Sequence, residues 1–108
     1  MIMQLLSHTQ ADAVSLETLS EKMRVSVFQV ERVIYTAIRE ERKAIVIDEN
    51  NCVYISNNPE EVRRAAERLQ LKAQNTGVKL ARDNLFEVAK TLLEIAEELE
   101  TTALRSVI

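Results

Sequence analysis

Apolar residues recur at helical spacing near the start of the chain. Leu16, Leu19 and Met23 follow one another at steps of three and four, which predicts a short helix with these side chains on its buried face. Ser15 directly precedes this helix and suits its N-cap, because a serine hydroxyl accepts a hydrogen bond from a free backbone N–H. Residues 1–10 are predicted to form an earlier helix.

A longer amphipathic segment extends from Val27 to Arg42. Ser26 precedes it and Gln29 follows three residues later, which is the spacing of a capping box at a helix N-terminus. The helical period predicts an inward face made of Val30, Val33, Ile34, Ala37 and Ile38. The outward face is predicted to carry Val27, Phe28, Glu31, Arg32, Tyr35, Arg39 and Arg42.

Two short runs with the alternation of β-strands follow this segment, at Ala44–Asp48 and Cys52–Ser56. The polar residues between them, Asp48, Glu49, Asn50 and Asn51, are typical of a tight turn. We expect a β-hairpin here. Residues 13–15 are predicted to add a further short strand to it.

A helix start is evident at residues 57–61. Asn58 is predicted to cap the helix and Pro59 to occupy its first position, with two glutamates at the positive end of the helix dipole. The predicted apolar face of this helix consists of Val62, Ala65, Ala66, Leu69 and Ala73. Residues 74–77 then interrupt the pattern.

The last segment carries apolar residues at alternating steps of three and four through three heptads. These heptad residues are Val78, Ala81, Leu85, Val88, Leu92, Ile95 and Leu99. A second apolar row is formed by Phe86, Ala89, Leu93 and Ala96. A helix that is apolar on two sides needs cover on both. We therefore expect one side to pack on its own chain and the heptad residues to form a homodimer interface; the alternative is a helix wholly inside a helical bundle.

These elements predict a mainly α fold with a small β-hairpin. Helix, turn, helix and hairpin in this order is the layout of a winged helix-turn-helix. We expect a winged-helix domain at residues 1–57. Residues 58–108 are expected to form a helical dimerisation element of two helices, the last of them long and coiled-coil-like.

The pattern Leu19-x-Glu21-x-Met23-x-Val25-Ser26-x-x-x-Val30-x-Arg32 resembles the helix-turn-helix signature of many bacterial and archaeal winged-helix regulators. The resemblance covers residues 13–56 and implies a DNA-binding fold. One residue departs from it: Arg24 stands where these families usually carry glycine. A glycine adopts a left-handed turn at little cost, whereas arginine either adopts it with strain or settles into another turn geometry.

The same segment is also similar to the winged helix that closes PCI domains. Val25-Ser26-Val27-x-x-Val30-Glu31-x-x-Ile34 and Ile47-Asp48-x-x-x-x-Val53-Tyr54-Ile55 carry this second resemblance. It implies protein contacts rather than DNA binding, and long helices after the winged helix.

Composition narrows the functional classes. The formal net charge is −3, so the chain is not a basic module, although a local basic stripe on an acidic protein is compatible with DNA binding. A single Gly excludes a glycine-rich phosphate loop, and no catalytic constellation is evident, so we expect neither an enzyme nor a cofactor.

Cys52 is the only cysteine and no metal-ligand spacing exists. No apolar run is long enough to span a membrane, and we expect a cytoplasmic protein.

The leading hypothesis is a small dimeric winged-helix DNA-binding protein that regulates transcription or replication. Arg32 would then read a guanine and Phe28 a thymine methyl. The full predicted nucleic-acid interface is Arg24, Ser26, Val27, Phe28, Glu31, Arg32, Tyr35, Arg39, Arg42, Lys43, Asn50 and Asn51. The alternative is a winged helix that binds a protein partner on its Val27/Phe28 face, or an adaptor subunit. The acidic hairpin tip and the negative net charge support that alternative.

Overall fold

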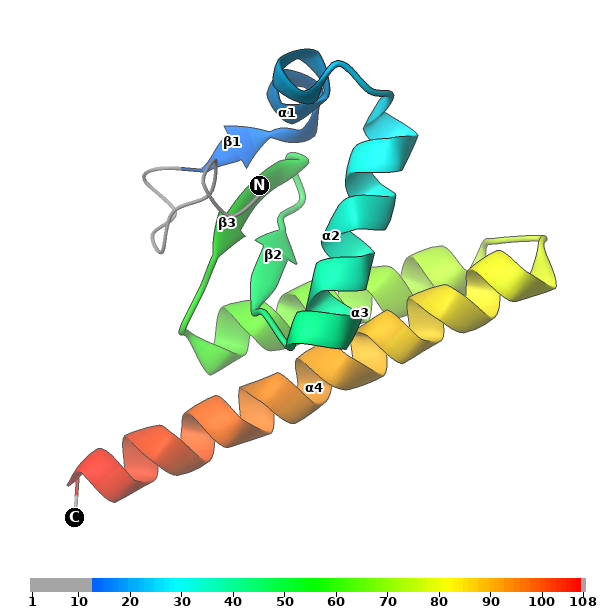
Figure 1. Cartoon of the computed structure of the whole chain (residues 1–108). Helices are drawn as coiled ribbons and strands as arrows, with labels where there is room; N and C mark the ends of the chain where they lie inside the picture. Colours follow the sequence, from blue (N-terminus) through cyan, green and yellow to red (C-terminus); the bar gives the residue numbers. More distant parts are fainter. Residues whose placement is uncertain (1–12, 108) are drawn as a thin grey trace.

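A computed structural model describes residues 13–107, with the side chains of residues 13–102 (Figure 1). Four helices and three strands follow one another along this part of the chain: β1 (Val14–Ser15), α1 (Leu16–Met23), α2 (Val27–Glu41), β2 (Ile45–Ile47), β3 (Cys52–Ile55), α3 (Pro59–Gln74) and α4 (Lys79–Val107). The predicted mainly helical fold with a small β-hairpin is therefore confirmed at this level. The helix predicted over residues 1–10 lies outside the described residues.

Serine side chains start both helices of the first half. The Ser15 hydroxyl accepts a hydrogen bond from the Thr18 N–H at 3.1 Å, and Ser26 does the same for Gln29 at 3.1 Å. The two serine caps are confirmed, but among the described residues the Gln29 side chain makes no return hydrogen bond of a capping box. Between the two helices Arg24 adopts a left-handed backbone, with φ 57°, where the resembling families place glycine.

The three strands form one antiparallel sheet in the order β1-β3-β2. Val14 pairs with Val53, and Ile47 pairs with Val53 from the other side. At the hairpin tip Asp48 Oδ1 accepts hydrogen bonds from the Asn50 and Cys52 N–H groups at 2.8 and 2.9 Å. Asn51 closes the turn with φ 61°, a conformation that asparagine tolerates better than most residues.

Helices α3 and α4 form a helical hairpin, and α4 runs back alongside α3 beneath α2 and the sheet (Figure 1). The start of α3 matches the prediction, because Asn58 Oδ1 accepts from the Glu60 N–H at 3.0 Å and Pro59 is the first helical residue. Arg68 Nε also donates to the Ile47 carbonyl at 3.0 Å, which attaches α3 to the sheet. No helix in the described part of the chain is both long and apolar enough to cross a bilayer.

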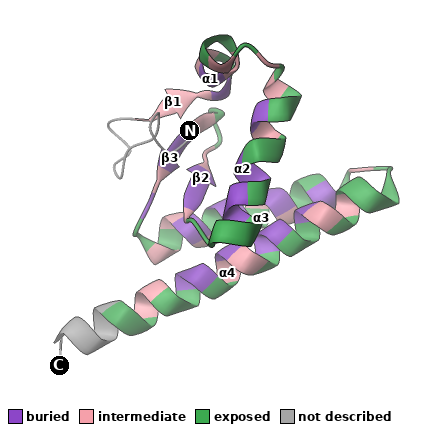
Figure 2. Cartoon of the chain, in the orientation of Figure 1, coloured by how far each residue is buried: buried purple, intermediate pink, exposed green. Residues whose placement is uncertain are grey.

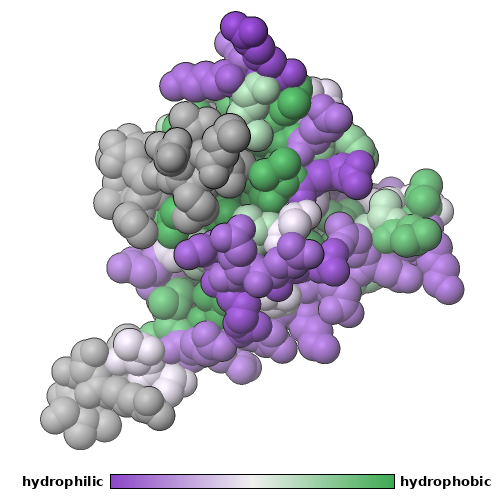
Figure 3. Space-filling model, viewed as in Figure 1, coloured by the Kyte–Doolittle hydropathy of each residue, from purple (hydrophilic) through white to green (hydrophobic). Residues whose placement is uncertain are grey.

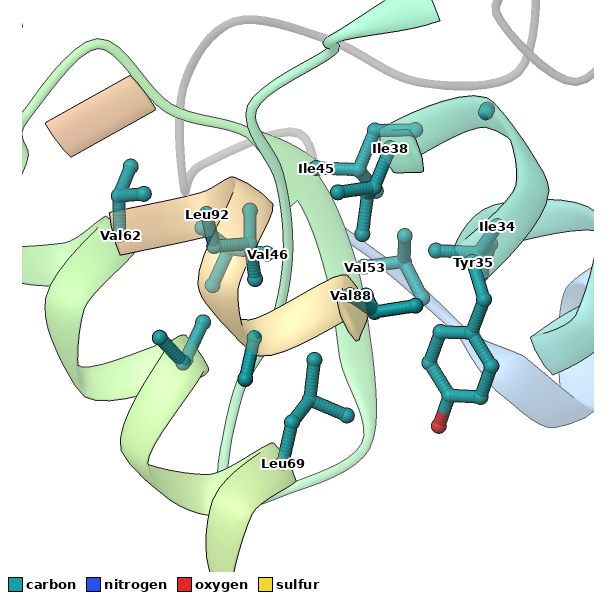
Figure 4. Packing of buried hydrophobic residues seen from close by; sticks show 14 of the residues in the cluster. Ile34, Tyr35, Ile38, Ile45, Val46, Val53, Val62, Leu69, Val88 and Leu92 are labelled. Atoms are coloured by element: carbon teal, nitrogen blue, oxygen red, sulfur yellow. The ribbon is translucent and has the colours of Figure 1, made fainter. Parts of the chain in front are cut away.

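A single hydrophobic cluster joins both halves of the chain. It extends from Leu16 in α1 to Ala96 in α4, and Figure 4 shows side chains of α2, the sheet, α3 and α4 packed against one another. Figure 2 shows the buried residues on the facing sides of these elements. The expected boundary after residue 57 therefore separates two stretches of sequence that share one core.

The heptad residues of α4 are largely part of this core, which corrects the expected interface. Val88 and Leu92 are fully buried within the single chain, and Leu85 and Ile95 are each 6% exposed. These four side chains are covered by α3 and the first half of the chain and leave no surface for a second chain. Leu99 is half-buried, and only Val78 and Ala81 are exposed. This part of α4 is closer to the alternative, a helix wholly inside a helical bundle, except that Phe86 of the second apolar row is 39% exposed.

Two positions of α2 also differ from the expected faces. Val33, placed inward by the helical period, is 40% exposed, whereas Tyr35, placed outward, is only 7% exposed. The reason is that α2 packs on α4 as well as on α1, with its buried side chains in the same cluster as those of the sheet. This second contact turns the buried stripe of α2 toward Tyr35 and away from Val33.

Candidate interaction surface on helix α2

The first turn of α2 presents an exposed aromatic side chain. Phe28 is 67% exposed, and its neighbour Val27 is half-buried against the core. Ser26 is exposed but uses its hydroxyl as the cap of α2. Arg24 and Arg32 are both exposed, and neither guanidinium has an ion pair or side-chain hydrogen bond within the described residues.

The middle of the same helix face is connected to α3. Tyr35 Oη donates to Glu31 Oε2 at 3.0 Å, and Lys72 Nζ donates to the same oxygen at 2.5 Å. Burial, together with the neighbouring Glu31 carboxylate, raises the pKa of Tyr35 far above its ordinary value. Glu31 and Tyr35 were expected to face DNA. They instead join α2 to α3.

The last turns of this face are connected to α4. Arg39 Nη1 donates to Asn84 Oδ1 at 2.5 Å. Arg42 donates to Glu94 Oε1 at 3.2 Å and to Glu98 Oε1 at 2.6 Å, and these contacts raise the pKa of its guanidinium. A cation already paired with two carboxylates is a poor phosphate ligand, because phosphate has to displace both of them. Arg42 is therefore not free to contact a phosphate, whereas Arg39 is held toward α4 by the uncharged amide of Asn84.

The remaining predicted DNA contacts lie apart from this row. Lys43 is exposed just after α2, with no side-chain partner among the described residues. Asn50 and Asn51 are exposed at the hairpin tip, where Asp48 and Glu49 also lie. The carboxylates of Asp48 and Glu49 therefore lie beside the two amides. Their negative charge repels the phosphates of an approaching DNA backbone.

A groove lies between the start of α2 and the α3–α4 turn. It has a volume of about 250 Å³ and a mainly apolar lining made of Phe28, Glu31, Arg32, Tyr35, Lys72, Thr76, Ala81, Asn84 and Leu85. Figure 3 shows apolar surface at the end of the molecule where α3 turns into α4, and Val78 and Leu80 there are 65% and 82% exposed. The sequence-based predictions named Phe28 and Arg32 correctly as exposed residues. They missed Lys72, Thr76 and Asn84.

The missed residues carry no sequence signal of their own. Lys72 belongs to a charged helix face of a kind that is usually only solvated, and Asn84 lies in the first turns of a long helix. Only the tertiary packing of α3 and α4 beside α2 places Lys72 and Asn84 in the same groove as Phe28. A charged pair between two helices that are distant in the sequence is not evident from the periodicity of either helix.

No protein-family model, curated protein or solved structure matches the chain. Within residues 13–107 no three His, Cys, Asp or Glu side chains gather as a possible metal site. A functional assignment therefore depends on the exposed side chains of α2 and the groove beside them.

Proposed function

We propose that this chain is a winged helix-turn-helix module that binds another protein through the first turns of α2 and the adjoining groove. The winged-helix assignment is supported by the order α1, turn, α2, hairpin, and by a sheet in which β1 joins the hairpin at β3. The hairpin tip at residues 48–51 takes the place of the wing. In this proposal the module acts in the cytoplasm and does not require a homodimer.

The observation that carries the proposal is the contrast between the two ends of α2. At its start Phe28 is 67% exposed beside a mainly apolar groove. At its end Arg39 and Arg42 are bound by α4. Exposed aromatic side chains next to a pocket are common anchors of protein interfaces, whereas DNA binding depends on free cations along the helix.

Duplex DNA is the second candidate, because three cations around α2 have no side-chain partner among the described residues. These are Arg24, Arg32 and Lys43. Arg32 lies one helical turn after Phe28 and is the residue expected to contact a base. The acidic hairpin tip and the formal net charge of −3 oppose this candidate.

Site-specific photocrosslinking in the source cells tests the proposal. The full chain carries p-benzoylphenylalanine at position 28 in one variant. A control variant carries it at position 64, an exposed residue of α3 that lies by the hairpin tip. We expect a discrete protein adduct from position 28 and none from position 64. Adducts to nucleic acid from position 28, or the same products from both positions, would overturn the proposal.

A further inference from the structure

We propose that the groove beside Phe28 binds a short acidic segment of a partner protein, in which carboxylates flank one large apolar side chain. This inference rests on the proposed protein-binding function and adds the chemical class of the partner. It comes from three properties of the groove: its size, the apolar side chains that line it, and the sign of the charge on its charged lining residues.

The size of the groove suits one side chain. Its volume of about 250 Å³ is below the roughly 300–1,000 Å³ of pockets that enclose a drug-sized ligand. Ala81 and Leu85 of α4 supply aliphatic lining, and Phe28 of α2 supplies aromatic lining. Because Ala81 is small and exposed, it leaves room for an incoming aromatic or leucine side chain. Burying such an anchor provides the apolar part of the binding free energy.

The charged side chains that line the groove have a net formal charge of +1, from Arg32 and Lys72 against Glu31, although the chain as a whole is negative. Arg39 donates to the lining residue Asn84. Among the lining residues Glu31 is the one carboxylate, and it is already bound by Lys72 at 2.5 Å. Arg32 has no carboxylate partner within the described residues, and Asn84, the partner of Arg39, is uncharged. A segment with carboxylates on either side of its anchor complements these lining cations.

Other occupants fit less well. A DNA backbone offers negative charge but nothing apolar to cover Phe28, Ala81 and Leu85. A second copy of this chain would add net charge of the same sign, since each copy carries −3. An acidic segment with an apolar anchor complements both the apolar lining and the lining cations of the groove.

Fluorescence anisotropy of the full chain with three short labelled peptides tests the inference. The probe has one Trp flanked by aspartates. One control peptide replaces the Trp by Ala, and the other replaces the aspartates by lysines. We expect saturable binding of the probe and at least about tenfold weaker binding of each control. Equal binding of the lysine peptide, or no binding of the probe, would overturn the proposed partner class.

Matched variants locate the binding site. Arg32→Glu is expected to weaken probe binding about tenfold or more, whereas Lys90→Glu, the same charge change at an exposed position of α4 outside the groove, leaves it within about twofold. Ala81→Trp fills the groove from an exposed position and is expected to abolish binding without unfolding the chain, as checked by circular dichroism. Equal effects of Arg32→Glu and Lys90→Glu would contradict the site.

Two further results separate this inference from the proposed function. A protein adduct at position 28 together with no binding of the acidic probe would overturn the proposed acidic partner. It would still support a protein-docking surface at the start of α2. Displacement of the probe by duplex DNA, or self-association of the wild-type chain that Ala81→Trp abolishes, would assign the groove to another occupant and overturn the inference.

Discussion

Substituting Leu92 tests whether α4 belongs to the core of its own chain. The sequence pattern placed this residue in a dimer interface, but its side chain is fully buried in the single chain. Leu92→Ala removes the buried Cγ methine and two methyl groups and leaves a cavity, which costs about 3–5 kcal/mol at such positions. A small domain typically has a total stability of about 5–15 kcal/mol, so this variant is expected to lose a large share of it.

The assay is urea unfolding followed by circular dichroism at a low and a high protein concentration. The control is Leu80→Ala on the same helix, where the side chain is 82% exposed and the expected cost is below about 0.5 kcal/mol. We expect the wild-type midpoint to be independent of concentration and the large loss to occur only in Leu92→Ala. A wild-type midpoint that rises with concentration, or equal costs for the two variants, would refute the assignment of α4 to a single-chain core.

Three further changes test local features of the fold. Arg24→Gly is expected to raise the free energy of unfolding by about 0.5–1 kcal/mol in urea titration, because φ is 57° there; a destabilised variant would contradict the left-handed turn. Asn58→Ala is expected to cost about 1 kcal/mol through loss of the α3 cap, and no loss would mean that the cap is dispensable. The pKa of Tyr35 is raised in the folded chain, so the unfolded chain releases this proton first as the pH rises above about 10, and folding stability falls there. Tyr35→Phe is expected to reduce that alkaline loss in pH-dependent unfolding, and an unchanged pH profile would contradict the raised pKa.

Local elements were predictable because their signals lie in neighbouring residues. Ser15, Ser26 and Asn58 cap the helices they were expected to cap. The strand at residues 13–15 also pairs with the hairpin as expected, through β1 (Val14–Ser15). Each of these features depends on a side chain and a backbone group a few residues away, so the order of residues is sufficient to indicate it.

Contacts between distant helices were not predictable in the same way. The heptad residues have the same spacing whether they face a second chain or the chain's own α3, because periodicity identifies a buried face and not what covers it. Tyr35 illustrates the consequence for the site. Its place in the helical repeat indicated solvent, but the packing of α2 on α4 and the contact with Lys72 bury it.

The central claim is that α2 offers a protein-docking surface at its start and not a DNA-reading surface along its length. The most direct measurement is a titration of the full isotope-labelled chain with short duplex DNA at low salt, followed by amide NMR spectra. We expect no saturable shift changes along α2 or at Lys43. Saturable, salt-sensitive changes at Arg24, Arg32 and Lys43 would contradict the claim and favour a DNA-binding winged helix.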